Sequence, residues 1–355
     1  MAVTKPAKSN DAYRQLKADI AAGSLKNLYL LHGEEVYLRD YYLGQMKQKL
    51  LPEGTDSFNY HSISGKACSA QVLSELVDAL PMMCERTMIV ATDFDLFKAP
   101  EAERKALEAL FSDLPDYCCL VFVYDTIAFK ADARMKSLSA ALKSTCQVVD
   151  FQRQSQADLI AWLSRRFRAL GHEIDASTAQ YLIFLCGDLM TSLISETGKI
   201  GAYAKEVNIT QSDIDAVAIP QIDAVVFQMT DALTRRQFDK AAGILGDLLH
   251  MQEPPIRILA VVGRHFRQLL SARIVLDSHK DVSYLAAMWS MRSSYGAQKL
   301  MQSARHFSPS WCRWAVRRCG ETDLAMKSVV GADSEALLVS LLLELSAKEA
   351  FDAAH

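Results

Sequence analysis

The sequence predicts an α/β domain with a P-loop-like parallel sheet, followed by two all-α domains. Over the first 150 residues or so, short apolar segments alternate with helical periods, a pattern typical of parallel strands joined by crossover helices. After Phe151 only helical periods follow. The chain has 355 residues, of which 50% are hydrophobic, so it can form two or three domains with packed cores.

The predicted strands are short and rich in apolar or β-branched residues, as buried parallel strands are. They span residues 28–31, 58–63, 86–92, 118–124 and 147–151. Helical periods lie between them at residues 38–51, 70–79, 101–114 and 135–143. Together these elements predict an N-terminal α/β domain over residues 1–152.

The remainder of the chain predicts helices alone. Ser155 stands where a helix N-cap belongs. The helical periods at residues 156–170, 176–186, 188–205 and 211–217 predict a small all-α domain over residues 153–220. A second all-α domain is predicted over residues 221–355, with breaks at residues 253–255, 308–309 and 331.

The segment 28–33 reads as a buried strand that runs into a glycine, as a nucleotide-binding P-loop does. An active loop has the pattern Gly-x-x-x-x-Gly-Lys-Ser/Thr, in which main-chain N–H groups and the lysine hold phosphates. Here leucine, arginine and aspartate stand at the last three motif positions, and two glutamates in the loop would repel phosphate. The aligned positions are Gly33, Glu34, Glu35, Leu38, Arg39 and Asp40. The turn is therefore predicted to serve packing, with an unorthodox ATP site as the alternative.

A Mg²⁺-binding strand of an ATPase ends in Asp-Glu. The corresponding strand here ends at Asp93, without the adjacent glutamate. We therefore expect Asp93 to cap the strand end and not to bind a metal.

The loop Leu80-Pro81-Met82-Met83 lies between a predicted helix and a predicted strand. Proline disfavours helical backbone at the residue before it, so the helix should end here. Two methionines exposed together at a loop tip indicate contact with a partner's pocket. The alternative is that they cap the local core.

Arg264 and Arg267 fall on one face of a predicted helix, and Trp289 and Arg292 form an aromatic and basic cluster near a turn. These four residues could face DNA, with arginine contacting phosphate and tryptophan stacking on a base. The alternative is a solvated face or ion pairs between subunits.

Several classes of protein are disfavoured by composition. The formal net charge of -3 argues against coating nucleic acid by bulk charge. The eight cysteines form no Cys-x-x-Cys pair and are expected to be buried thiols in a reducing cytosol. Residues 1–10 lack the apolar core of a signal peptide, and no run suits a membrane span, so a cytoplasmic location is expected. We expect no metal, no cofactor and no catalytic residues.

Four blocks of the sequence resemble the delta subunit family of bacterial DNA polymerase III clamp loaders. The turn at residues 29–38 resembles the family's glycine, acidic pair, aromatic and leucine, and residues 80–86 resemble its Pro-Phe-Phe-Gly-x-Arg element. Residues 302–308 resemble its Gln-Ala-Arg-x-Phe-Ser block, and residues 321–328 its Asp-x-x-x-Lys-Ser signature. The resemblance runs from about residue 10 to 346, in the family's order.

The resemblance implies a degenerate AAA+ module made of the α/β domain and a helical lid, then a helical collar. It implies a non-enzymatic subunit of a DNA-directed DNA polymerase, a nucleotidyltransferase, that binds and opens the sliding beta clamp through residues 80–83. Further implied partners are the ATPase and delta-prime type subunits, through the collar, and primer-template DNA in the assembled complex. Met82 and Met83 depart from the family's usual aromatic or leucine pair. The alternatives are an active AAA+ ATPase of the helicase-loader or chaperone type and an interaction protein outside replication.

Overall fold

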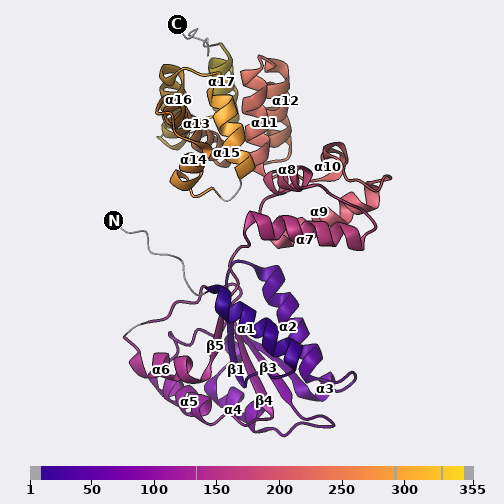
Figure 1. The fold of residues 1–355 in the computed structure, drawn as a ribbon. Helices are drawn as coiled ribbons and strands as arrows, with labels where there is room; N and C mark the ends of the chain where they lie inside the picture. Colours follow the sequence, from indigo (N-terminus) through magenta and orange to yellow (C-terminus); the bar gives the residue numbers. More distant parts are fainter. Residues whose placement is uncertain (1–8, 133, 292–293, 329–330, 348–355) are drawn as a thin grey trace. The chain divides into compact units, whose positions relative to one another are not determined.

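The computed structural model describes residues 9–132, 134–291, 294–328 and 331–347, and Figure 1 shows its fold. The chain divides into two compact units, residues 1–154 (unit 1) and residues 155–355 (unit 2). Unit 1 is α/β and unit 2 is all-helical, which confirms the predicted fold class. The further division of the helical part into residues 153–220 and 221–355 stays a prediction.

Unit 1 is built on a five-stranded sheet in which all neighbouring strands are parallel, in the order β2-β3-β4-β1-β5. The strands are β1 (Leu28–His32), β2 (Tyr60–Ser64), β3 (Thr87–Thr92), β4 (Cys118–Val123) and β5 (Gln147–Asp150). Strand β1 lies between β4 and β5, with Leu30 paired to Phe122 and Val148. The predicted strand at 58–63 began two residues too early, because Phe58 and Asn59 belong to a helical turn.

Helices cover both faces of this sheet. They are α1 (Ser9–Ala22), α2 (Val36–Leu50), α3 (Asp56–Asn59), the 3₁₀ turn η1 (Gly65–Ala67), α4 (Ala70–Asp78), α5 (Glu101–Ser112) and α6 (Lys136–Thr145). Helices α4, α5 and α6 share a hydrophobic core with alternate strand residues such as Leu30, Ile89 and Phe122. Helices α1 and α2 pack together on the sheet's other side (Figure 1). Because both faces are covered, the strands are almost continuously apolar.

Unit 2 begins with four helices, and side-chain N-caps fix the starts of three of them. They are α7 (Gln156–Ala169), α8 (Ala176–Cys186), α9 (Met190–Tyr203) and α10 (Gln211–Val217). The hydroxyl of Ser155 accepts a hydrogen bond from the Asp158 N–H, as predicted for an N-cap. Asp175 caps α8 in the same way, and Thr210 forms a capping box at α10.

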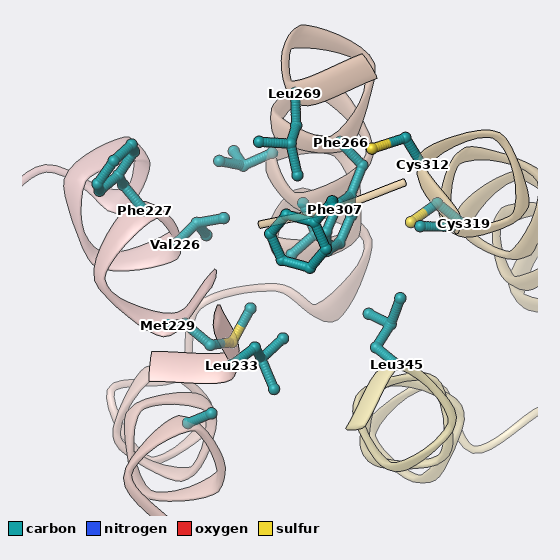
Figure 2. Close-up of a cluster of buried hydrophobic side chains, with 14 of the residues drawn as sticks. Val226, Phe227, Met229, Leu233, Phe266, Leu269, Phe307, Cys312, Cys319 and Leu345 are labelled. Atoms are coloured by element: carbon teal, nitrogen blue, oxygen red, sulfur yellow. The ribbon is translucent and has the colours of Figure 1, made fainter. Parts of the chain in front are cut away.

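The remaining helices enclose one large core, shown in Figure 2. They are α11 (Ile222–Thr234), α12 (Phe238–His250), α13 (Pro255–Asp277), α14 (Val282–Met288), α15 (Ser294–Ala304), α16 (Pro309–Ser328) and α17 (Ser334–Ala347). Helix α13 packs against α11, α15, α16 and α17. Its Ile258, Val262, Phe266 and Leu269 recur every three or four residues and are buried, so one stripe of α13 faces this core.

No helix among the described residues is long and apolar enough to cross a membrane. Within the same residues, no group of three or more His, Cys, Asp or Glu side chains is arranged to hold a metal ion.

Candidate functional sites at the two edges of the sheet

The turn between β1 and α2 is short. Helix α2 begins at Val36, only three residues after Gly33, so Leu38, Arg39 and Asp40 lie inside the helix and not in a loop. Gly33 has a φ of 124°, and a Cβ there would lie 2.4 Å from the main-chain oxygen of Phe151. The close approach of another main chain therefore requires glycine at this position.

The segment after β5 forms hydrogen bonds with the polar groups of this turn. The Phe151 N–H donates to the His32 carbonyl at 2.7 Å, and the Glu35 N–H donates to the Phe151 carbonyl at 2.8 Å. The Glu35 side chain is fully buried. The Glu34 carboxylate accepts from Arg153 Nε at 2.5 Å. Carboxylates and a neighbouring main chain thus occupy the place where an ATPase presents free N–H groups to phosphate.

Arg39, which stands at the motif's lysine position, is a buried structural cation. Its side chain donates to the Tyr124 carbonyl at 3.0 Å, to Asp125 Oδ1 at 2.6 Å and to Asp40 Oδ1 at 3.0 Å. The residue is only 3% exposed. Its positive charge is therefore compensated within the protein, by Asp125 just after β4 and by Asp40 on its own helix.

Asp93, just after β3, caps the same segment. Its carboxylate accepts hydrogen bonds from the N–H groups of Asp125, Thr126 and Ile127 and from the Thr126 hydroxyl. Burial raises the pKa of Asp93, but these hydrogen bonds outweigh it and hold the pKa below its usual value. The geometry agrees with the predicted strand-end cap.

The methionine loop, residues 80–83, lies at the opposite, amino-terminal edge of the sheet, shortly before β3. Met82 is 55% exposed and Met83 is 87% exposed, and Leu80 beside them is exposed as well. Met83 has a φ of 60°, a conformation uncommon for a residue with a side chain. The two methionines therefore project from a defined turn and do not cap the core.

Two side chains anchor this loop. The Arg86 guanidinium donates to the Leu25 carbonyl, to the Asn27 side chain and, at longer range, to the Cys118 carbonyl. These hydrogen bonds connect the start of β3 to the starts of β1 and β4. The buried carboxamide of Asn59 hydrogen-bonds the main chain of Met82. Asn59 was not predicted from the sequence, because its position reads as the start of a strand.

The four residues predicted to face DNA are not equivalent in the structure. Arg264 forms an ion pair with Asp223, which satisfies its charge within unit 2. Trp289 packs partly buried against the helical core, and its indole N–H is buried. Arg267 is exposed and has no ion pair with any described residue. Arg292 lies outside the described residues. The DNA contact stays a prediction, and Arg267 is the residue in the best position to make it.

The fold defines the class: an α/β domain with a P-loop-like parallel sheet, joined to a helical unit. The family described as "DNA polymerase III, delta subunit" matches residues 29–152, and "DNA polymerase III delta subunit, C-terminal domain" matches residues 223–345. The chain belongs to the DNA polymerase III delta subunit family. This confirms the family resemblance found in the sequence.

Individual relatives agree with this membership over most of the chain. The DNA polymerase III subunit delta of Bacillus subtilis is 22% identical over 339 residues, covering 94% of this chain and 95% of that protein. A protein described as a probable DNA polymerase III subunit delta of Aquifex aeolicus is 23% identical over 267 residues, 73% of this chain and 74% of that one. The structure of the Bacillus subtilis DNA clamp loader delta protein matches with a TM-score of 0.54 and 21% identity, covering 95% of this chain and 99% of that one.

Proposed function

We propose that this protein is the clamp-loader subunit that binds and opens the sliding beta clamp during replication, without hydrolysing ATP itself. The observation that carries the proposal is the pair of exposed methionines, Met82 and Met83, on an anchored loop in a member of this family. Apolar side chains held in water at a loop tip are suited to a hydrophobic pocket on a partner. Methionine is flexible and can fill an irregular pocket.

Opening a ring in this way requires no bond chemistry. The loop has only to bind one conformation of the clamp more tightly than the closed one, and the difference in affinity shifts the population toward the open state. This role is compatible with the closed turn after β1, where Arg39 and Glu35 are buried within the protein.

The test is clamp binding by the Met82→Ala/Met83→Ala double variant, measured by surface plasmon resonance with the clamp of the same cell. Complete burial of two such side chains contributes about 3–6 kcal/mol before association costs, so we expect affinity to fall at least about 100-fold. Met251→Ala is the matched control, because Met251 is also exposed but lies in unit 2. Unchanged affinity of the double variant would refute the assignment.

An active AAA+ ATPase is the alternative function, and nucleotide binding separates the two. We expect a fluorescent ATP analogue to show no saturable binding to the purified chain, because the turn offers no free N–H cradle and no lysine. Submicromolar binding would favour the ATPase. A pull-down that captures no clamp would favour an interaction protein outside replication.

Assembly with ATPase and delta-prime type subunits is assigned to unit 2. Helix α17 exposes Val339 and Leu343, one turn apart, beside the buried face that it presents to α13 and α16. Leu324 on α16 is exposed too. These side chains are suited to apolar contacts with neighbouring collar domains.

Contact with primer-template DNA in the assembled complex is assigned to Arg267. Neutralising Arg264 and Arg267 should weaken DNA binding by the loader and lower the slope of log affinity against log salt by about 1 for each phosphate that is no longer neutralised. Because Arg264 is paired with Asp223, the single variant Arg267→Ala should account for most of the change. An unchanged salt slope would contradict a phosphate contact.

A further inference from the structure

Asn59 connects a fully buried side chain to the tip of the exposed methionine loop. It is the last residue of α3, next to the start of β2, and it is 0% exposed. Its Oδ1 accepts from the Met82 N–H at 2.7 Å, and its Nδ2 donates to the Met82 carbonyl at 2.7 Å. Nδ2 also donates to the Thr55 carbonyl at 2.8 Å, which fixes the orientation of the carboxamide.

The two hydrogen bonds fix the main chain of Met82 and leave its side chain exposed to solvent. Among the described residues, they are the hydrogen bonds that hold residues 80–83. The next restraint along the chain is at Cys84, whose thiol donates to the Arg86 carbonyl. The tip would therefore lose its fixed conformation without Asn59, although the ends of the loop would stay anchored.

We propose that Asn59 is a positioning residue for clamp docking, which holds the Met82 main chain so that Met82 and Met83 are presented in their binding conformation before the clamp arrives. The inference rests on the proposed function for the identity of the partner. Presenting a loop already ordered avoids its ordering cost at the moment of binding. If the released loop adopted the competent conformation for only about one-tenth to one-hundredth of the time, the apparent affinity would fall by the same factor.

The first measurement needs no clamp. Hydrogen exchange of the full-length chain should show protection of the Met82 amide in the wild type, although its side chain is exposed, and fast exchange in Asn59→Ala. Gln147→Ala is the matched control: Gln147 is also a buried amide of unit 1, but its Nε2 donates to the Ala12 carbonyl, away from the loop. It should leave the exchange of the Met82 amide unchanged.

The second measurement is clamp affinity by surface plasmon resonance. Asn59→Ala should bind the clamp about 10- to 100-fold more weakly than the wild type. Gln147→Ala should bind like the wild type. Circular dichroism and the hydrogen exchange of the β1 and β4 amides verify that unit 1 is folded in each variant.

Asn59→Asp provides a signature that a merely structural role would not give, and it keeps the shape of the side chain if the alanine variant fails to fold. The ionised carboxylate can accept from the Met82 N–H but repels the Met82 carbonyl. The protonated carboxyl has an O–H that can donate to this carbonyl again. The affinity of Asn59→Asp relative to the wild type should therefore rise as the pH falls.

The outcomes separate this inference from the proposed function. If Met82→Ala/Met83→Ala loses clamp binding but Asn59→Ala and Asn59→Asp bind like the wild type, the positioning role is wrong and the proposed function stands. If exchange of the Met82 amide is the same in Asn59→Ala and the wild type, the positioning role is also wrong. If the wild type does not bind the clamp at all, the proposed function fails, and the docking role of Asn59 fails with it.

Discussion

Arg39→Lys places the lysine of an active P-loop at the matching position, and the structure predicts that unit 1 loses stability. The guanidinium makes three hydrogen bonds, to Tyr124, Asp125 and Asp40, in directions that one ammonium group cannot serve at once. Loss of two charge-assisted bonds at about 1.5 kcal/mol each gives about 3 kcal/mol. The side chains of Asp40 and Asp125 are 59% and 42% exposed and can be rehydrated, which lowers the expected loss to about 2 kcal/mol.

The assay must report on unit 1 alone. The four tryptophans of the chain, at positions 162, 289, 311 and 314, all lie in unit 2, so their fluorescence does not follow the sheet. Native-state hydrogen exchange of the β1 and β4 amides measures the opening free energy of unit 1 directly. Tryptophan fluorescence during urea unfolding then serves as an internal reference for unit 2.

Arg134→Lys is the matched control, because Arg134 is 89% exposed and pairs with Asp132 at the surface. Surface pairs contribute little, so this variant should lose less than about 1 kcal/mol. A structural role of the Arg39 guanidinium would be refuted if Arg39→Lys were no more destabilising than Arg134→Lys. It would also be refuted if Arg39→Lys acquired submicromolar affinity for ATP, because the turn would then be an open cradle.

Two further predictions concern stability. Gly33→Ala should destabilise unit 1 by more than about 2 kcal/mol, since the new Cβ meets the Phe151 main chain at positive φ. Gly44→Ala, inside α2 where a Cβ would meet no other atom, should stabilise unit 1 by about 0.5–1 kcal/mol. Hydrogen exchange measures both variants, and equal effects would contradict the prediction. Burial lowers the pKa of His265 from 6.5 to about 4, so the unfolded chain binds the proton more readily than the folded chain does. The free energy of unfolding should therefore fall as the pH drops from about 6.5 toward 4, by at most about 3 kcal/mol. His265→Leu should flatten this dependence in urea unfolding followed by tryptophan fluorescence, and an unchanged slope would show that another group is responsible.

The strands and most helices could be predicted because each depends on local pattern. Buried parallel strands are short apolar runs, and the exposed loop at Met82 and Met83 was signalled by the adjacent Pro81. Helix α1 was not predicted, and neither was α3, which has only four residues and no apolar period.

The anchors of the two sites could not be predicted, because their partners are far away in the sequence. Arg39 bonds a carbonyl 85 residues further on, and Asn59 bonds a main chain 23 residues further on. The departure of Arg39 from the motif indicated that something had changed, but not that its charge was satisfied internally. The burial of Trp289 depends on the packing of distant helices, so its sequence neighbours alone indicated an exposed aromatic.

The closed turn after β1 also has a thermodynamic consequence. A protein that binds a nucleotide only when folded becomes more stable as the nucleotide concentration rises, by about 4 kcal/mol at a thousand times the Kd. In unit 1 the Phe151 main chain and the Arg39 guanidinium already make the contacts that such a ligand would supply. We therefore expect the stability of unit 1 to be the same in ATP and in ADP. Under the proposed function, the methionine loop would then be presented whatever the energy state of the cell, and neighbouring subunits would set the timing of clamp opening.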